Sequence, residues 1–532
     1  MAATVTASEL KAMLHDGGEL ALLDVREEGV FSKRHLLFAV SMALSRLELR
    51  IDALVPRKGT RIVLCDADDG LAAKAAAKLT ALGYRDVRRL AGGLEAWAKA
   101  GYELFSGVNV PSKAFGEYVE HHENTPRMDA EEIKAKLDSG ADMIILDSRP
   151  LTEYRNMSIP TGIDCPGAEL VWRVHDLVKS PDTLVVVNCA GRTRSIIGAQ
   201  SLINAGIPNK VVALKNGTMG WHLAGFKVAK GATQLAPDPT PAGIAKAKQA
   251  AAAVAKRFGV QTIDKKRLEA LKAEREQRSL YLLDVRSPEE YQRGHVAGTR
   301  HAAGGQLVQS TDQYVGTRNA RLVLFDDHGV RAVMTASWLI QMGWQEVYVL
   351  ADALVGETLV SGAEPVSVPG LDKVKVETIA PAALKAALDA KQAVVVDLDN
   401  SLAYRAGHIP GAWFAIRSRF ATSLAKLPPA ATLVLTSPDG VLARLAAPEA
   451  AAASGRPVKV LDGGTAAWRA AELPIETGDT NLADEADDAW YRPYDRKAGV
   501  EAAMRDYLSW EIDLVAQIER DGDARFHIAP RG

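Results

Sequence analysis

The sequence predicts an α/β protein made of four tandem copies of one small domain, each a mostly parallel sheet flanked by helices, followed by a helical C-terminal extension. Short runs of Val, Ile and Leu alternate with longer Ala- and Leu-rich helical patterns, which is typical of such sheets. A chain of 532 residues is too long for a single core. An apolar strand that ends in aspartate also recurs four times, at Asp24, Asp147, Asp284 and Asp397.

The elements of each copy are expected in the same order. A short helix comes first, near residues 10–14, 133–137, 268–271 and 384–388. The strand that ends in aspartate follows, and then a second apolar strand at residues 62–64, 184–187, 322–324 and 433–435. Each second strand leads into a loop that opens with Asp66, Cys189, Asp326 or Ser437. Because sites in these folds form where parallel strands end, the loops are candidate sites, and only Cys189 supplies a sulfur nucleophile.

The repeats divide the chain into four domains and two further segments. The expected domains are residues 1–106, 107–230 with a connector at its start, 261–366 and 367–478. A Pro-, Ala- and Lys-rich stretch at 231–260 predicts a linker with a helix that joins two double-domain halves. Residues 479–532 predict the helical extension. Its amphipathic stripe is expected to form either a packing surface or a homo-oligomer contact, and consists of Tyr507, Trp510, Leu514 and Ile518.

The charge and hydropathy of the chain exclude several kinds of partner. With 64 basic and 66 acidic residues the sequence has no basic stripe for nucleic acid or anionic lipid, so we expect neither as a partner. No signal-peptide pattern and no run of about 18 apolar residues is present. A cytoplasmic protein is therefore expected.

The cysteines and histidines predict neither a disulfide framework nor a metal or cofactor site. The three cysteines form no C-x-x-C pair, which fits a reducing compartment. The adjacent pair His121-His122 could bind a metal, but no constellation of cysteines and carboxylates accompanies it in the sequence. Cys65 ends an apolar strand and is expected in the core, whereas Cys165 is either a core residue or a resolving or protective cysteine.

The loop at residues 189–195 carries the clearest chemistry of the chain. It reads Cys-Ala-Gly-Arg-Thr-Arg-Ser and lies between an expected strand and an expected helix, whose positive end stabilises a thiolate. Arg192 and Arg194 are expected to lower the thiol pKa and to bind an anion, while Gly191 leaves the loop N–H groups accessible. Arg173 is expected either to bind the same anion or to form a surface salt bridge. The candidate substrate-binding residues are Ala190, Gly191, Arg192, Thr193, Arg194, Ser195 and Arg173.

Three ordered motifs resemble those of the rhodanese (sulfurtransferase) family. An Asp-x-Arg corner begins at Asp24, Asp147 and Asp284, and changes to Asp-Leu-Asp at 397–399. A Gly-His-Ile-Pro-Gly turn lies at 407–411, with altered forms at 294–298 and 158–162. A Gly-Gly-x-x-x-Trp element lies at 92–97 and 463–468, with a variant at 216–221. The resemblance covers roughly residues 5–478.

The resemblance implies a sulfurtransferase whose partners are a small-molecule donor and acceptor. Cys189 would take a sulfane sulfur from a donor such as thiosulfate, hold it as a persulfide, and pass it to cyanide or a thiol. Asp147 and Arg149 are expected to pin the corner before the loop through charge-assisted hydrogen bonds. Related loops commonly carry glycine three places after the cysteine, where this chain has Arg192, so the donor stays open.

The other three loops are expected to be inactive. Asp66 is followed by further carboxylates that would repel an anion. Asp326 replaces the thiol, although Arg331 in the same loop matches Arg194 in spacing. Ser437 has a hydroxyl, which cannot form a persulfide.

Two alternative functions remain open from the sequence. One is a persulfide carrier or binding scaffold that delivers sulfur to a partner protein. The other is a cysteine-dependent phosphatase or arsenate reductase, whose loops have the form Cys-x-x-x-x-x-Arg. Here arginine comes one place early, at Arg194, and Ser195 occupies the phosphatase position.

Overall fold

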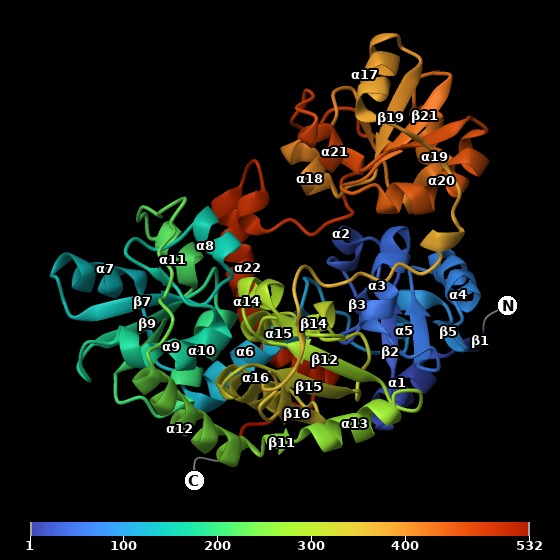
Figure 1. The fold of residues 1–532 in the computed structure, drawn as a ribbon. Coiled ribbons are helices and arrows are strands. Elements are labelled where there is room, and N and C mark those ends of the chain that lie inside the picture. The colour runs from blue at the N-terminus through green and yellow to red at the C-terminus, as the bar shows by residue number, and fades with distance from the viewer. Residues whose placement is uncertain (1–2, 530–532) are drawn as a thin grey trace.

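The computed structural model describes residues 3–529 and contains four five-stranded sheets with one shared topology (Figure 1). The strand orders are β1-β5-β4-β2-β3, β6-β10-β9-β7-β8, β11-β16-β15-β12-β14 and β18-β22-β21-β19-β20. Every pairing within these sheets is parallel. The predicted fold class is therefore confirmed.

Helices alternate with the strands in the first two domains, as the periodicity predicts. The first holds β1 (Ala3–Val5), α1 (Ala7–His15), β2 (Ala21–Asp24), α2 (Glu28–Phe31), β3 (Val40–Ser41), α3 (Leu47–Leu54), β4 (Arg61–Cys65), α4 (Leu71–Ala81), β5 (Asp86–Leu90) and α5 (Gly93–Lys99). The second holds α6 (Val110–Glu123), β6 (Arg127–Met128), α7 (Ala130–Asp138), β7 (Met143–Asp147), α8 (Leu151–Asn156), β8 (Ile163–Asp164), α9 (Leu170–Leu177), β9 (Leu184–Asn188), α10 (Thr193–Asn204), β10 (Val211–Leu214) and α11 (Gly217–Leu223). Strand β9 is buried along its whole length, because helices cover both faces of the sheet.

The third and fourth domains repeat this order. After α12 (Pro241–Phe258), the third holds β11 (Gln261–Ile263), α13 (Lys265–Ala273), β12 (Leu280–Asp284), α14 (Pro288–Arg293), β13 (His295–Val296), β14 (Arg300–His301), α15 (Gly304–Gln309), β15 (Arg321–Phe325), α16 (Val330–Gln341), β16 (Val347–Leu350) and β17 (Leu359–Val360). The fourth holds β18 (Glu377–Ile379), α17 (Pro381–Asp389), β19 (Ala393–Asp397), α18 (Ser401–Ala406), β20 (Trp413–Phe414), α19 (Phe420–Ser423), β21 (Thr432–Thr436), α20 (Val441–Ser454), β22 (Val458–Leu461) and α21 (Gly464–Ala470). Helix α22 (Val500–Asp521) lies in the C-terminal extension. A short antiparallel pair, β13 with β17, is an addition of the third domain.

The linker sequence suggests that domains one and two form one half and domains three and four the other, but the packing of the domains differs. One continuous apolar core joins the second and third domains, and α12 packs against both α9 and α16. Trp338 on α16 donates a hydrogen bond to Ser201 on α10 at 2.8 Å. The first domain contacts the fourth, which lies above it in Figure 1, through polar pairs such as Glu48 with Arg417 at 3.1 Å, and it also contacts the third domain through hydrogen bonds at residues 20 and 54. The expectation of two sequential double-domain halves is wrong, because the shared apolar surface lies between domains two and three.

The C-terminal extension returns from the fourth domain to the second. Helix α22 packs along α6, so the expected connector before the second domain is largely a buried helix. Leu514 and Ile518 join a buried cluster with Phe105 and Val110, and Trp510 packs against it. The stripe thus lies against its own chain and is not a free surface for a second copy. No helix within residues 3–529 has the length and apolar character needed to span a bilayer.

Candidate active site

Cys189 lies at the carboxyl end of the central strand β9, four residues before α10 begins at Thr193. Its side chain is almost fully buried, at 2% exposure. The thiol donates to the Ser195 hydroxyl at 3.6 Å, and that hydroxyl donates to the Arg192 carbonyl at 2.7 Å. The loop therefore folds back on itself around the sulfur atom.

The variant Asn-Gly-Thr-Met-Gly-Trp element at residues 216–221 binds this loop through backbone hydrogen bonds. The backbone N–H groups of Thr218 and Met219 donate to the carbonyls of Cys189 and Ala190 at 2.8 and 2.9 Å. Gly217 has a φ of +56°, and a Cβ there would lie 2.4 Å from the Cys189 carbonyl oxygen. Glycine is required at this position because both the backbone conformation and the close approach exclude a side chain.

The Asp-x-Arg corner forms a buried ion pair beneath the loop. Arg149 donates from Nε and from one terminal nitrogen to the two oxygens of Asp147, at 2.8 and 2.7 Å, and also to the Met157 carbonyl at 2.6 Å. Asn188, which precedes the nucleophile, donates to Asp147 at 2.8 Å. This geometry fixes the end of β7 relative to the end of β9. Neither Asp147 nor Arg149 lines the cavity at Cys189.

Both loop arginines are engaged by carboxylates. Arg194 forms a bidentate pair with Glu153 on α8, at 2.9 and 2.8 Å. Arg192 donates to Glu117 on α6 at 2.7 and 2.6 Å and to Glu120 at 2.5 Å. Burial alone would raise the pKa of Glu153, but the Arg194 guanidinium lowers it to about 2. The positive charge expected for an anionic donor is thus largely neutralised.

The Cys189 thiol is not the activated thiolate that the loop sequence suggests. Burial raises its pKa above the ordinary value, while Arg194 and the Ser195 hydroxyl oppose that shift and Glu511 adds to it. The expectation of a lowered pKa is therefore wrong for the free protein, because removal of the sulfur from water outweighs the nearby guanidinium.

Arg173 lies away from the cavity that contains Cys189. It donates to Glu169 one turn earlier at 2.8 Å, and to the carbonyl of Ala236 and the carboxylate of Asp238 in the linker at 3.0 and 3.1 Å. Of its two expected roles, the structure shows the salt bridge.

The other two cysteines are buried core residues. Cys65 and Cys165 are each 0% exposed and belong to apolar clusters. Burial raises the pKa of both thiols. Neither lines the cavity at Cys189.

In two of the three degenerate loops, a carboxylate caps the N-terminus of the helix that follows. Asp326 accepts backbone N–H groups of Gly329 and Arg331 at 2.6 and 2.8 Å. Asp66 likewise accepts the N–H of Ala72 at 2.9 Å. Because these carboxylates occupy the place where an anionic ligand would bind, the loops act as internally capped structures.

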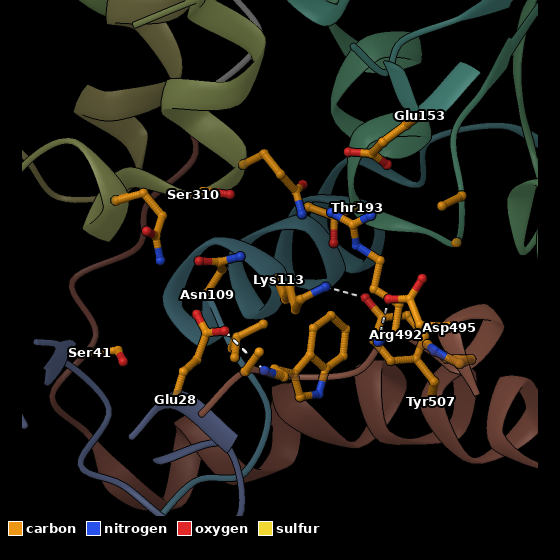
Figure 2. A pocket seen from close by; sticks show the side chains of 18 of the residues that line it. Glu28, Ser41, Asn109, Lys113, Glu153, Thr193, Ser310, Arg492, Asp495 and Tyr507 are labelled. Atoms are coloured by element: carbon orange, nitrogen blue, oxygen red, sulfur yellow. Dashed lines mark hydrogen bonds between the residues drawn. The ribbon is translucent and has the colours of Figure 1, made fainter. Parts of the chain in front are cut away.

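A cavity of about 750 Å³ opens at Cys189 and is lined by residues of all four domains and of the C-terminal extension. Figure 2 shows Glu28 and Ser41 of the first domain on one side and Glu153 and Thr193 of the second on the other. Residues 190–194 of the loop line it as well. The third and fourth domains and the extension contribute further residues, including Gln306, Leu402 and Trp490.

The lining residues that were not anticipated from the sequence include Lys113, Tyr507 and Glu511. Lys113 lies on the buried face of α6, and Glu511 lies one turn from Tyr507 on the inner side of α22. Charged residues on otherwise apolar helix faces are the signal that could have identified them. Within residues 3–529, no group of three or more His, Cys, Asp or Glu side chains is placed to hold a metal ion.

Comparison with known proteins gives one consistent family. The family model described as a rhodanese-like domain matches residues 6–100, 129–224, 266–356 and 380–471. The crystal structure of a thiosulfate sulfurtransferase from Pseudomonas aeruginosa is 49% identical, with a TM-score of 0.96 over 99% of this chain and 100% of that one.

Two shorter relatives match single regions. The thiosulfate sulfurtransferase GlpE of Vibrio cholerae is 28% identical over 79 residues, which is 15% of this chain and 73% of the relative. YrkF of Bacillus subtilis, named as a candidate sulfur carrier protein, is 26% identical over 136 residues, 24% of this chain and 72% of the relative. With four matched segments and a relative that is similar over its whole length, this chain belongs to the rhodanese-like family.

Proposed function

We propose that the protein is a sulfurtransferase that moves a sulfane sulfur from a donor such as thiosulfate to a thiophilic acceptor through a persulfide on Cys189. The observation that carries the proposal is the position of Cys189 at the end of β9, where the other three loops have aspartate or serine. Similarity to the Pseudomonas aeruginosa thiosulfate sulfurtransferase over the whole chain supports it.

The chemistry has two balanced steps. The Cys189 thiolate attacks the outer sulfur of thiosulfate, the sulfur–sulfur bond of the donor breaks, and sulfite leaves with the electron pair. An acceptor such as cyanide then attacks the outer sulfur of the persulfide, and Cys189 leaves as a thiolate. Backbone N–H groups at the start of α10 can stabilise the negative sulfur in both steps.

The burial of Cys189 favours small-molecule substrates over a protein partner. A thiol with 2% exposure at the wall of a cavity lined by all four domains can be reached by a small donor or acceptor more readily than by the cysteine of another folded protein. A carrier function stays as the second candidate because of the similarity to YrkF. Steady-state turnover with cyanide or small thiols separates the two.

A phosphatase function fits this geometry less well. Arg194 stands one residue early for that class and both its terminal nitrogens are bound by Glu153. We further propose the cytoplasm as the compartment, since a reducing environment suits a chain whose three cysteines are free.

The test is an intact mass after incubation with thiosulfate and removal of excess donor. The protein should gain one sulfur atom, and Cys189→Ser should gain none. Cys65→Ser and Cys165→Ser are the matched controls and should still gain the sulfur, because both thiols lie in the core. Sulfur transfer that survives in the Cys189 variant would overturn the proposal.

A further inference from the structure

Two helices outside the family-matched segments reach the nucleophile loop. Helix α6 lies between residues 100 and 129 and α22 lies after residue 471, and neither range is matched by the rhodanese-like model. Together they bring Lys113, Tyr507 and Glu511 to the cavity wall. Lys113 and Tyr507 are labelled in Figure 2. This part of the cavity is therefore an addition to the family domain.

One oxygen of Glu511 is fully engaged. Its Oε1 accepts from the Tyr507 hydroxyl at 2.9 Å, from Lys113 Nζ at 3.2 Å and from the Thr193 hydroxyl at 3.5 Å. Lys113 also hydrogen bonds to the Tyr507 hydroxyl, as the dashed line in Figure 2 marks. The side chains of Glu511 and Lys113 are 2% and 5% exposed. The carboxylate is thus held in one orientation.

The other oxygen of Glu511 is left without a partner. Within residues 3–529 its Oε2 is buried and accepts no hydrogen bond. It faces the nucleophile loop, since a Cβ placed on Gly191 would lie 3.1 Å from it. A buried carboxylate oxygen without a donor is energetically costly, so its retention beside a substrate cavity indicates a ligand that supplies one.

The charges of the nucleophile loop and of Lys113 favour a hydrogen-bond donor over an anion beside Glu511, although Arg46, Arg50 and Arg492 line other parts of the cavity. Arg192 is matched by two carboxylates and Arg194 by one, and Lys113 is matched by Glu511. No cation at the loop is left unpaired among these three. In the acceptor step, a carboxylate carried by the acceptor would be repelled by Glu511, whereas an ammonium group would pair with it.

We propose that Glu511 is a specificity-determining residue of the acceptor step, and that its Oε2 accepts a hydrogen bond from an ammonium or N–H group beside the acceptor thiol. Aminothiols are then the preferred class of acceptor. This inference rests on the proposed persulfide at Cys189. The acceptor thiolate attacks the outer sulfur, the bond to Cys189 breaks with its electron pair on Cys189, and the product is the aminothiol persulfide.

The experiment compares three acceptors of similar size on protein loaded with thiosulfate. Cysteamine carries a cation, 2-mercaptoethanol is neutral, and 3-mercaptopropionate is an anion. Rate constants for loss of the persulfide are expressed per thiolate concentration. The parent protein should prefer cysteamine to 3-mercaptopropionate by about tenfold or more, as expected for a charged hydrogen bond. In Glu511→Gln this ratio should fall to about one to threefold.

Two further variants separate specificity from structural damage. Glu519→Gln changes an exposed carboxylate on the same helix and should keep the ratio of the parent. Lys113→Met combined with Glu511→Leu removes the buried pair without leaving an unpaired lysine, and should lower the ratio as Glu511→Gln does. A purely structural role would slow all three acceptors together and leave the ratio unchanged.

The outcomes distinguish this inference from the proposed function. If the parent protein never gains sulfur on Cys189, the proposed function fails. If it gains sulfur but shows no preference for cysteamine, or if the preference persists in Glu511→Gln and in the double variant, the role of Glu511 is overturned. If Glu511→Gln does not load, the double variant decides, and a preference that survives there overturns the inference as well.

Discussion

At the scale of single residues, charge compensation controls the nucleophile. The loop contains two arginines, but carboxylates from α6 and α8 bind both of them. Burial therefore raises the Cys189 pKa, and the opposing effect of Arg194 is insufficient to reverse it. We infer that the free protein holds a thiol at neutral pH, and that attack on a donor becomes faster as the pH rises.

Alkylation of Cys189 by iodoacetamide tests this electrostatic balance. In a background with Cys65→Ser and Cys165→Ser, the rate should reach half its maximum above about pH 8.5, the usual value for a free cysteine. Arg194→Gln should move the midpoint higher, because Arg194 lowers the thiol pKa and its loss leaves Glu153 negative nearby.

The matched control for that profile is Arg173→Gln. Arg173 is also partly buried and salt-bridged, but it lies outside the Cys189 cavity, so the midpoint should not move. A midpoint that is unchanged in Arg194→Gln would show that the guanidinium does not act on the sulfur.

At the scale of elements, the loop depends on the turn before α11. The N–H groups at the start of α11 bind the carbonyls of Cys189 and Ala190, and Gly217 makes that contact possible. The same arrangement recurs in the fourth domain, where Thr465 N–H donates to the Ser437 carbonyl at 2.9 Å. The Gly-Gly-x-x-x-Trp element and its variant thus position the loop both in the domain that carries the cysteine and in a domain that lacks it.

Gly217→Ala should displace the nucleophile loop and lower kcat/KM for sulfur transfer by about tenfold or more, since steric strain of roughly 1–3 kcal/mol falls on the loop backbone. Gly225→Ala is the control, because Gly225 also has a positive φ, +82°, but a Cβ there meets nothing within 4 Å. That variant should lose about 1–2 kcal/mol of stability and keep its kcat/KM. Equal losses of activity in both variants would mean that backbone strain alone, not loop contact, is responsible.

At the scale of the whole molecule, the degenerate domains form walls of the active-site cavity. Arg50 of the first domain, Gln306 of the third and Leu402 of the fourth line the same cavity as Cys189. In the third domain, Arg331 matches Arg194 in spacing but is bound by Glu169, Glu290 and Asp327, at 2.8, 2.6 and 2.8 Å. Its partner Glu169 belongs to the second domain, so the arginine joins two domains and is not free for a ligand.

The third domain should therefore stay inactive after a single change. Asp326→Cys in a Cys189→Ser background should give only traces of thiosulfate-to-cyanide transfer, because Arg331 stays bound to carboxylates and Asp327 stays beside the new thiol. Replacing residues 327–330 by Ala-Gly-Arg-Thr as well should increase turnover. Strong transfer by the single variant would contradict this account, and would indicate that the third domain lacks only a sulfur atom.

The sequence by itself determined the repeated α/β domain, the ends of the strands and the copy that carries the thiol. These features follow from local patterns. Short apolar runs predict strands that are buried on both faces, and a residue directly after strand β9 must lie at the carboxyl edge of its sheet. The Asp-x-Arg ion pair is equally local, since Asp147 and Arg149 are two residues apart.

Only the tertiary structure decided how the domains pair and which charges surround Cys189. Glu117 lies 75 positions from Arg192, and Glu511 lies 318 positions from Thr193. No periodicity within a helix specifies which distant helix will cover it, because amphipathic faces of similar size can pack in several combinations. The electrostatic environment of Cys189 depends on those contacts between distant segments. The raised pKa of the Cys189 thiol and the position of Glu511 Oε2 therefore follow from the tertiary structure and not from local sequence.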